Sequence, residues 1–318
     1  MIHLETRPRA KVNLALAMTG RRADGYHELA SVFLRVGLSD RLSVRFADPS
    51  ADRDQLTITG DDALPVEGNL VSRAVEMLRG EAGLPLPFLH LALEKRIPVA
   101  AGLGGGSADA AAALDLAATA WGIGLSPDRE QALALALGAD VPFFAGDLAA
   151  ALVTGIGERL EPLPGLRGDA GLLIVTPPIA LATRAVFRAY DQLHGSAPGA
   201  AGSPAKKTVD ALAEVLRDGL DGSEVVAWGD RLAEANDLWP AARAVEPDLA
   251  RVRSALEHRL GRRMLMTGSG STLVGLYASA DEAADAGRLL ISNPSAGLDG
   301  STIAACDLIG PDPTWRHP

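Results

Sequence analysis

A glycine-rich stretch between residues 98 and 109 constrains the fold of this chain more than any other feature. It reads Pro98-Val-Ala-Ala-Gly-Leu-Gly-Gly-Gly-Ser-Ala-Asp109, after an apolar run expected to be a strand (Leu86 to Leu93) and before an alanine-rich segment expected to be a helix. Four glycines within five residues remove the β-carbons that would hold a ligand off the backbone, so several N–H groups can converge on one anion. We expect the helix to be entered at Ser107 and to add the positive end of its dipole. The stretch therefore predicts a phosphate-binding turn.

Two widespread phosphate loops do not fit this stretch. The P-loop requires a lysine directly after its last glycine, and the dinucleotide-binding fingerprint requires a third glycine where Ser107 stands. Ser107 can instead cap the helix or reach a phosphate-bound metal. Because a glycine-rich turn alone is equally compatible with a plain connection, its function has to be argued from the rest of the chain.

The size and charge of the chain limit what else it can be. At 318 residues it exceeds the usual single-domain range, and we expect two domains, residues 1–165 and 166–318. A net charge of −10 argues against a nucleic-acid or membrane surface, because such partners favour a basic face. The single cysteine, Cys306, has no partner for an internal disulfide, which fits a reducing cytoplasm. The N-terminal residues lack the apolar core of a signal peptide, and no apolar run reaches membrane-spanning length.

Hydrophobic spacing along the chain predicts an α+β fold. In the first half, alternation of apolar and polar residues predicts strands at 3–6, 11–18, 32–36 and 40–46. Helical spacing predicts one helix at 69–79. A helix after Ser126-Pro127 should end at Gly138. In the second half we expect strands at 171–176, 263–266, 273–277 and 301–308, and helices at 183–193, 209–216, 225–235, 248–260 and 281–290. The small-residue stretch 195–204 is expected to be a surface loop.

Two charged residues occupy unusual places. Lys11 lies inside an otherwise apolar strand, where a charged side chain is uncommon. Asp140 follows a helix stop and precedes Val-Pro-Phe-Phe, so it suits either a turn or a carboxylate against an apolar wall. The serine- and glycine-rich segment 267–272 suits a plain hairpin connection. None of these residues settles a function alone.

Taken together, the motifs resemble the GHMP kinases, the superfamily of galactokinase, homoserine kinase and mevalonate kinase. The glycine-rich stretch resembles their central phosphate-binding motif. Four further motifs are similar to the branch that acts on a diphosphocytidyl substrate of the non-mevalonate isoprenoid route: Ala10-Lys11-Val-Asn13-Leu, Arg22-Ala-Asp24-Gly25-Tyr26-His27-Glu28-Leu, Gly138-Ala-Asp140-Val-Pro-Phe-Phe and Asn236-Asp-Leu. Because all four stand in the family order, coincidence is improbable.

The resemblance implies a two-domain kinase of the α+β class. Its N-terminal domain would be like the second domain of ribosomal protein S5, its C-terminal domain would be ferredoxin-like, and the site would lie between them. Asp140 would accept or orient the proton of the acceptor hydroxyl, and Lys11 would keep that carboxylate ionised and stabilise the transition state.

The resemblance also assigns binding residues. Those for ATP are Asn69, Lys95, Pro98, Val99, Ala100, Ala101, Gly102, Leu103, Gly104, Gly105, Gly106, Ser107 and Ala108. Those for the substrate are Asn13, Tyr26, His27, Thr183 and Phe187, with Tyr26 offering a stacking face and His27 edge hydrogen bonds to cytosine. Mg²⁺ is expected with ATP, and its protein ligands stay open.

The implied reaction is ATP-dependent phosphorylation of the 2-hydroxyl of 4-diphosphocytidyl-2-C-methyl-D-erythritol, by a cytoplasmic monomer or homodimer. Two alternatives remain open. One is another GHMP kinase acting on a sugar, homoserine or mevalonate, although the Gly-Glu-His-x-Asp-Tyr segment of galactokinase is absent near the start. The other is a non-catalytic relative that binds ATP without turnover.

Overall fold

The computed structural model describes residues 2–61, 63–195, 202–292 and 298–307. The chain forms two compact units that interleave along the sequence. Unit 1 comprises residues 1–10, 38–99 and 104–148, and unit 2 comprises residues 11–37, 100–103 and 149–318. A single division into residues 1–165 and 166–318 remains a proposal. Most of the small-residue stretch (196–201) and the end of the chain from Leu308 onward lie outside the described residues.

Unit 1 is built on a four-stranded sheet with the order β1-β4-β6-β5. Its strands are β1 (His3–Thr6), β4 (Arg41–Phe46), β6 (Leu89–Glu94) and β5 (Gln55–Thr59). The pairings β1–β4 and β4–β6 are antiparallel, and β5–β6 is parallel. In β6 buried leucines alternate with half-buried residues, as expected for a strand with one face against a core.

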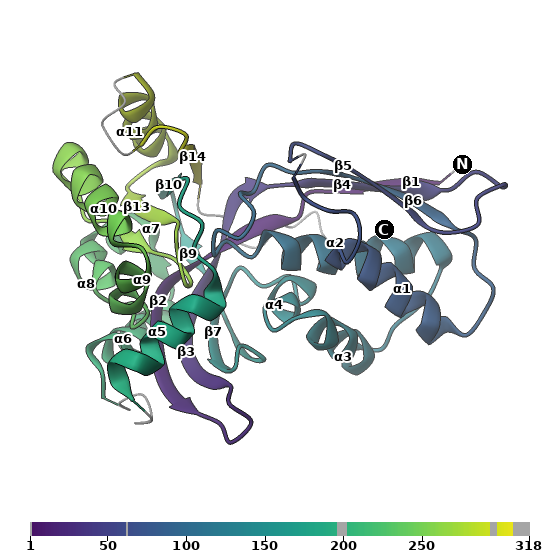
Figure 1. Cartoon of the computed structure of the whole chain (residues 1–318), viewed down its shortest axis with the longest axis horizontal. Helices are drawn as coiled ribbons and strands as arrows, with labels where there is room; N and C mark the ends of the chain where they lie inside the picture. Colours follow the sequence, from purple (N-terminus) through teal and green to yellow (C-terminus); the bar gives the residue numbers. More distant parts are fainter. Residues whose placement is uncertain (1, 62, 196–201, 293–297, 308–318) are drawn as a thin grey trace. The chain divides into compact units, whose positions relative to one another are not determined.

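Helices cover one side of this sheet (Figure 1). They are α1 (Leu70–Ala82), α2 (Gly105–Trp121), α3 (Pro127–Leu137) and α4 (Val141–Ala145). Asn69 begins α1 because its side-chain oxygen accepts a hydrogen bond from the N–H of Val71 at 3.0 Å. Alanines dominate the buried side of α2, so its neighbours α1 and α4 can approach closely. This packing fixes the start of α2 beside the glycine-rich turn.

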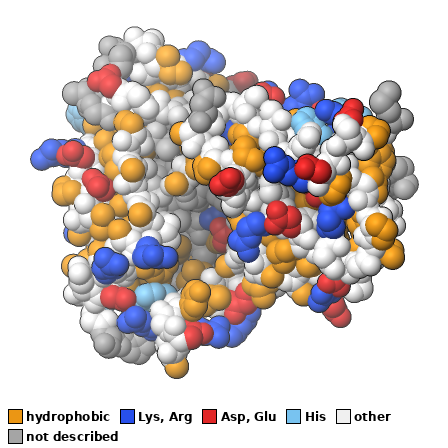
Figure 2. All heavy atoms as spheres, turned by 45° about the vertical axis from the view of Figure 1, so that its right-hand side comes forward, with side chains coloured by type: hydrophobic (Ala, Val, Ile, Leu, Met, Phe, Trp, Pro, Cys, Tyr) orange, Lys and Arg blue, Asp and Glu red, His pale blue; other side chains and the backbone are white. Residues whose placement is uncertain are grey.

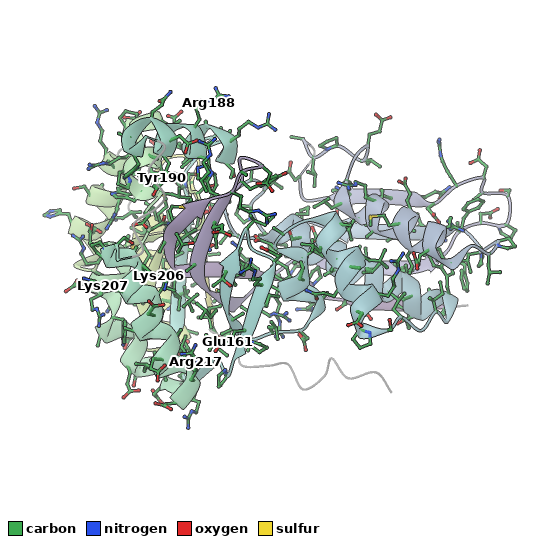
Figure 3. The ribbon with its side chains drawn as sticks, turned by 90° about the horizontal axis from the view of Figure 1, so that it is seen from below. Glu161, Arg188, Tyr190, Lys206, Lys207 and Arg217 are labelled. Atoms are coloured by element: carbon green, nitrogen blue, oxygen red, sulfur yellow. The ribbon has the colours of Figure 1, made fainter. Side chains whose placement is uncertain are left out.

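Unit 2 contains most of a second four-stranded sheet, β2-β3-β7-β8. Its strands are β2 (Arg9–Arg21), β3 (His27–Ser39), β7 (Ala150–Gly155) and β8 (Arg159–Leu163). β2 and β3 are much longer than the alternation predicts, since both are buried over most of their length. An ion pair of 2.7 Å between Arg217 and Glu161 joins β8 to helix α6 (Pro204–Asp218). Both residues are labelled in Figure 3.

A third, fully antiparallel sheet has the order β12-β13-β10-β14. Its strands are β12 (Leu265–Met266), β13 (Leu273–Tyr277), β10 (Gly171–Thr176) and β14 (Thr302–Asp307), and a short parallel pair joins β9 (Leu166–Arg167) to β11 (Leu220–Asp221). The remaining helices are α5 (Thr183–His194), α7 (Gly222–Ala227), α8 (Gly229–Ala233), α9 (Trp239–Val245), α10 (Pro247–Leu260) and α11 (Ala280–Ser292). One hydrophobic core joins β10 and β13 to α5, α9, α10 and α11.

The elements depart from the expected ones at identifiable places. The single helix expected at 225–235 is two helices, because Trp228 ends α7 and begins α8. A capping box between Asp221 and Glu224 also starts α7 earlier than expected. The Val-Pro-Phe-Phe segment, for which no element was predicted, forms the short helix α4.

The surface mixes charges of both signs. On the face drawn in Figure 2, lysine and arginine side chains are interspersed with aspartate and glutamate. Within the described ranges, no helix is both long and apolar enough to cross a membrane.

Candidate active site

The glycine-rich turn leads into α2 earlier than expected. The helix begins at Gly105, with Gly104 as its cap in a left-handed conformation (φ 71°). The first bond of the helix runs from the N–H of Ala108 to the carbonyl of Gly104 at 2.9 Å, so the preceding amides are left for an anion. Ser107 therefore does not cap the helix, and that alternative is wrong. Its second expected role, toward a phosphate-bound metal, remains a prediction.

Within unit 2 the middle of the turn packs on the segment 267–272. Gly102 has φ 77°, and a β-carbon at this position would lie 2.7 Å from the carbonyl oxygen of Thr267. Only glycine combines that conformation with so close an approach. The segment 267–272 joins the antiparallel strands β12 and β13, so the expected hairpin connection is confirmed, and it also supports the turn.

Lys11 and Asn13 lie together on β2, and both are buried. The Nζ atom of Lys11 donates to Asn13 Oδ1 at 2.7 Å and to the carbonyl of Gly102 at 3.3 Å, and it lies 4.4 Å from the centre of the Phe33 ring. Asn13 Nδ2 donates to Ser31 at 2.9 Å. These contacts orient the ammonium group beside the glycine-rich turn.

The Asn236-Asp-Leu motif hydrogen-bonds with both the 267–272 connection and β2. Asn236 Nδ2 donates to the carbonyls of Met266 and Gly268 at 2.8 and 2.9 Å. Asp237 accepts a hydrogen bond from the N–H of Met18 on β2 at 2.9 Å. The motif therefore fixes the 267–272 hairpin against β2. This structural role was not predicted from the sequence.

Asp140 belongs to unit 1, where it directly precedes α4. Burial of Val141, Phe143 and Phe144 anchors that helix, while Asp140 itself is only half-buried. Its pairing with Lys11, which belongs to unit 2, remains a proposal.

Lys95 lies in a buried cluster with two carboxylates of unit 1. Its Nζ atom donates to Asp40 and, at 2.7 Å, to Asp109. The other oxygen of Asp40 accepts the N–H groups of Arg96 and Ile97 at 2.6 and 2.8 Å. The cluster thus joins the end of β6 to the N-terminal part of α2. A nucleotide contact of Lys95 or of Asn69 stays a prediction.

Asp109 is the unusual member of this cluster. Its Oδ1 atom is buried and has no hydrogen-bond partner among the described residues. Burial raises the pKa of Asp109 to about 7. The positive charge of Lys95 lowers this pKa, whereas the nearby Asp40 carboxylate raises it further. Neither Asp40 nor Asp109 was selected from sequence, because they contact Lys95 across 55 and 14 residues.

A cavity of about 580 Å³ in unit 2 brings together three of the expected substrate residues. Tyr26, His27 and Phe187 all line it, and Tyr26 is 62% exposed. The remaining lining residues are Arg21, Gly25, Leu29, Ile156, Arg184, Arg188 and Asp191. Thr183, one turn before Phe187, hydrogen-bonds with Ser269 at 2.9 Å instead.

Helix α5 supplies one wall of the cavity. In Figure 3 Arg188 points outward from α5 and Tyr190 toward the interior, in agreement with their exposed and buried states. The His27 ring centre lies 5.1 Å from that of Phe187. His27 Nε2 lies 2.6 Å from Asp191 Oδ1. The arginines and Asp191 were missed from sequence, although helical spacing places Arg184, Phe187 and Asp191 on one face.

Comparison with known proteins identifies the family. Residues 69–155 match the family described as GHMP kinases N terminal domain. Among the described residues, no three His, Cys, Asp or Glu side chains are grouped to hold a metal ion.

Curated relatives cover most of the chain. A 4-diphosphocytidyl-2-C-methyl-D-erythritol kinase of Parvibaculum lavamentivorans is 40% identical over 286 residues, 89% of this chain and 91% of the relative. The protein of the same name from Pelotomaculum thermopropionicum is 39% identical over 86% of this chain and 89% of the relative.

Solved structures show the same fold. A crystal structure of 4-(cytidine 5'-diphospho)-2C-methyl-D-erythritol kinase matches with a TM-score of 0.73 and 33% identity, over 96% of this chain and 100% of that one. A homoserine kinase from Cytophaga hutchinsonii, at 19% identity, matches with a TM-score of 0.68 over 98% of this chain and 96% of that one, and indicates the fold alone. The expected α+β fold of the GHMP kinases is confirmed. The chain belongs to the 4-diphosphocytidyl-2-C-methyl-D-erythritol kinase family of the GHMP kinases.

Proposed function

We propose that this protein transfers the γ-phosphoryl group of ATP to the 2-hydroxyl of 4-diphosphocytidyl-2-C-methyl-D-erythritol, giving the 2-phosphate and ADP. The observation that carries the proposal is the cavity lined by Tyr26, His27 and Phe187 in a chain about 40% identical to kinases named for this substrate. Homoserine and mevalonate carry no nucleobase and would leave such a cavity unused.

The lining of the cavity suits a diphosphocytidyl group. Tyr26 and Phe187 supply aromatic faces for the cytosine ring, and His27 supplies hydrogen bonds to its edge. Arg21, Arg184 and Arg188 supply positive charge for a diphosphate. The site is thus locally basic in a chain whose net charge is −10. Asn13 and Thr183 remain proposed substrate contacts.

The glycine-rich turn is the proposed ATP site. Amides at the start of α2 and the positive end of its dipole would bind the phosphates. Mg²⁺ bound to those phosphates would neutralise charge during transfer. Because Mg²⁺ keeps several waters and takes few protein ligands, the half-buried Ser107 hydroxyl would be the one protein ligand proposed for it.

Lys11 and Asp140 are the proposed catalytic residues. The ammonium of Lys11 is held by Asn13 and Gly102 and would stabilise the negative charge that spreads over the transferring group. The carboxylate of Asp140 would accept or orient the proton of the attacking hydroxyl. The order of proton and phosphoryl transfer does not affect this assignment.

The proposal is tested by a coupled assay of ADP release. We expect turnover with the diphosphocytidyl substrate and only background rates with mevalonate, homoserine and galactose. Turnover of one of those three in preference would identify another GHMP kinase. ATP binding without turnover of any of them would identify a non-catalytic relative. The single cysteine, which has no partner for an internal disulfide, supports a cytoplasmic location, and sizing by light scattering would distinguish monomer from homodimer.

A further inference from the structure

We propose that Asp191 sets the base specificity of the cavity by fixing which ring nitrogen of His27 carries the proton. Asp191 is thus a positioning residue that acts through His27. The inference rests on the proposed function, because it concerns how cytosine is told from uracil at the same site.

The geometry makes Asp191 a hydrogen-bond acceptor for His27. Asp191 Oδ1 lies 2.6 Å from His27 Nε2, and its other oxygen lies 3.6 Å from the guanidinium of Arg21. A carboxylate beside that cation offers only acceptor oxygens. Nε2 therefore carries the proton, since the partner of one ring nitrogen decides the state of the other.

The second ring nitrogen is then an acceptor. Within the part of the chain that the structure describes, Asp191 is the only hydrogen-bond partner of the His27 side chain. With the proton on Nε2, Nδ1 of a neutral imidazole presents a lone pair. An exocyclic amine, as in cytosine, can donate to this lone pair, whereas the carbonyl oxygen that replaces the amine in uracil would face it without a hydrogen.

Neighbouring rings hold the imidazole in place. Phe187 lies 5.1 Å away with its ring tilted by 37°, and Tyr190 meets the imidazole edge-on at 6.1 Å. His27 is 12% exposed at its side chain. Because the ring is confined on these sides, the hydrogen bond to Asp191 also fixes its orientation. With the wrong base bound, the confined imidazole would keep a ring nitrogen without a hydrogen bond. Binding sites in which the wrong ligand leaves a buried polar group unpaired discriminate strongly between ligands.

The substitution Asp191→Asn tests the inference with little change in shape. The amide group can donate to Nε2, which moves the imidazole proton to Nδ1 and turns the acceptor into a donor. We expect the ratio of kcat/KM for the cytidine substrate to that for its uridine analogue to fall roughly 10- to 100-fold. Asp191→Glu, which keeps an acceptor, should retain most of the preference. Asp210→Asn is the matched control, because Asp210 lies on α6 in an exposed ion pair with Lys206, and it should leave the ratio unchanged.

Nitrogen-15 NMR of His27 gives a readout that does not depend on activity, and its measurement on the wild-type protein does not depend on any variant folding. We expect the wild-type protein to show the proton on Nε2 and Asp191→Asn to show it on Nδ1. A wild-type proton on Nδ1, or an unchanged cytidine preference in Asp191→Asn, would overturn the inference while cytidine turnover leaves the proposed function standing. Failure of the wild-type protein to bind or phosphorylate either substrate would overturn the proposed function, and the specificity role with it.

Discussion

Lys95 donates a 2.7 Å hydrogen bond to one oxygen of Asp109, and the other oxygen of that carboxyl is buried with no partner among the described residues. One lysine therefore faces two carboxylates, Asp40 and Asp109, in a site where all three side chains are at most 3% exposed. A proton on Asp109 balances the charge of the cluster. This agrees with the rise in the pKa of Asp109, which burial causes and the nearby Asp40 carboxylate increases. Asp40 itself accepts hydrogen bonds from two backbone N–H groups.

The first prediction concerns stability and pH. Burial raises the pKa of Asp109 from 3.8 to about 7, so the folded protein keeps a proton that the unfolded chain releases above about pH 4. The contribution of Asp109 to the free energy of unfolding is therefore fully present at low pH and falls as the pH rises to about 7. At about 1.4 kcal/mol per pKa unit the change is on the order of 4 kcal/mol at most. Denaturant unfolding between pH 4.5 and 8.5 should show a flatter pH profile for Asp109→Asn than for the wild type, and parallel profiles would refute the assignment.

The second prediction compares Asp40 with Asp109 at pH 8. Asp40 accepts hydrogen bonds at both oxygens, so an asparagine there would point its amide hydrogens at another donor in either orientation. We expect Asp40→Asn to lower the free energy of unfolding by about 3 kcal/mol or more. Asp109→Asn resembles the protonated acid and should cost less. Equal losses for the two variants in urea unfolding would contradict this account.

The third prediction concerns the glycine-rich turn. Gly102→Ala forces a left-handed conformation on a residue with a β-carbon 2.7 Å from the carbonyl of Thr267, and should destabilise the protein by about 2 kcal/mol or more. ATP affinity, measured by calorimetry, should fall as well. Gly80→Ala is the control, since Gly80 lies in α1 with open space around it and alanine there should stabilise by about 0.5 to 1 kcal/mol. A Gly102→Ala protein with wild-type stability and ATP affinity would show that the turn tolerates a side chain.

The fourth prediction concerns the proposed catalytic pair. Asp140→Asn and Lys11→Met should each lower kcat by about 100-fold or more, while the KM for ATP changes little. Because the two groups would act as a unit, the double variant should be scarcely slower than either single one. Lys11 is buried and hydrogen-bonded to Asn13, so thermal unfolding of Lys11→Met has to accompany the kinetics. Wild-type turnover in Asp140→Asn would remove Asp140 from the mechanism.

The fifth prediction concerns substrate binding. Tyr26 is 62% exposed, so Tyr26→Ala should leave stability nearly unchanged. Loss of the stacking face should raise the KM for the cytidine substrate by about 10-fold or more, with a smaller effect on kcat. Tyr26→Phe keeps the ring and should behave like the wild type. A Tyr26→Ala enzyme with unchanged KM would place the base elsewhere.

Local sequence patterns correctly predicted the strands and helices whose formation depends on interactions between residues close in the sequence. Alternation located β1 and β4, and helical spacing located α1 and α10, because burial of one face fixes both kinds of element. Motifs predicted the family. The start of α2 was misplaced because Gly104, and not Ser107, takes the capping position.

Contacts between distant residues were beyond such patterns. Lys95 was expected to bind ATP, which stays a prediction, and only the fold shows its contacts with two buried carboxylates. Asp191 contacts His27 although 164 residues separate them in the sequence. The spacing of Asp191 from Phe187 predicts that both lie on one face of a helix, but it does not predict that Asp191 contacts His27. Such contacts depend on how whole helices and strands pack against one another. The sequence of a single segment does not determine that packing.

Phosphorus-31 NMR of a reaction mixture tests the central claim most directly. With ATP, Mg²⁺ and 4-diphosphocytidyl-2-C-methyl-D-erythritol, we predict a new phosphomonoester signal that grows in step with ADP and forms about 100-fold more slowly or less with Asp140→Asn. Because C2 carries a methyl group and no hydrogen, the signal should lack the three-bond proton coupling that a phosphate on a primary or secondary hydroxyl would show. ADP formed without that signal, or no signal from the folded wild-type protein, would contradict the account.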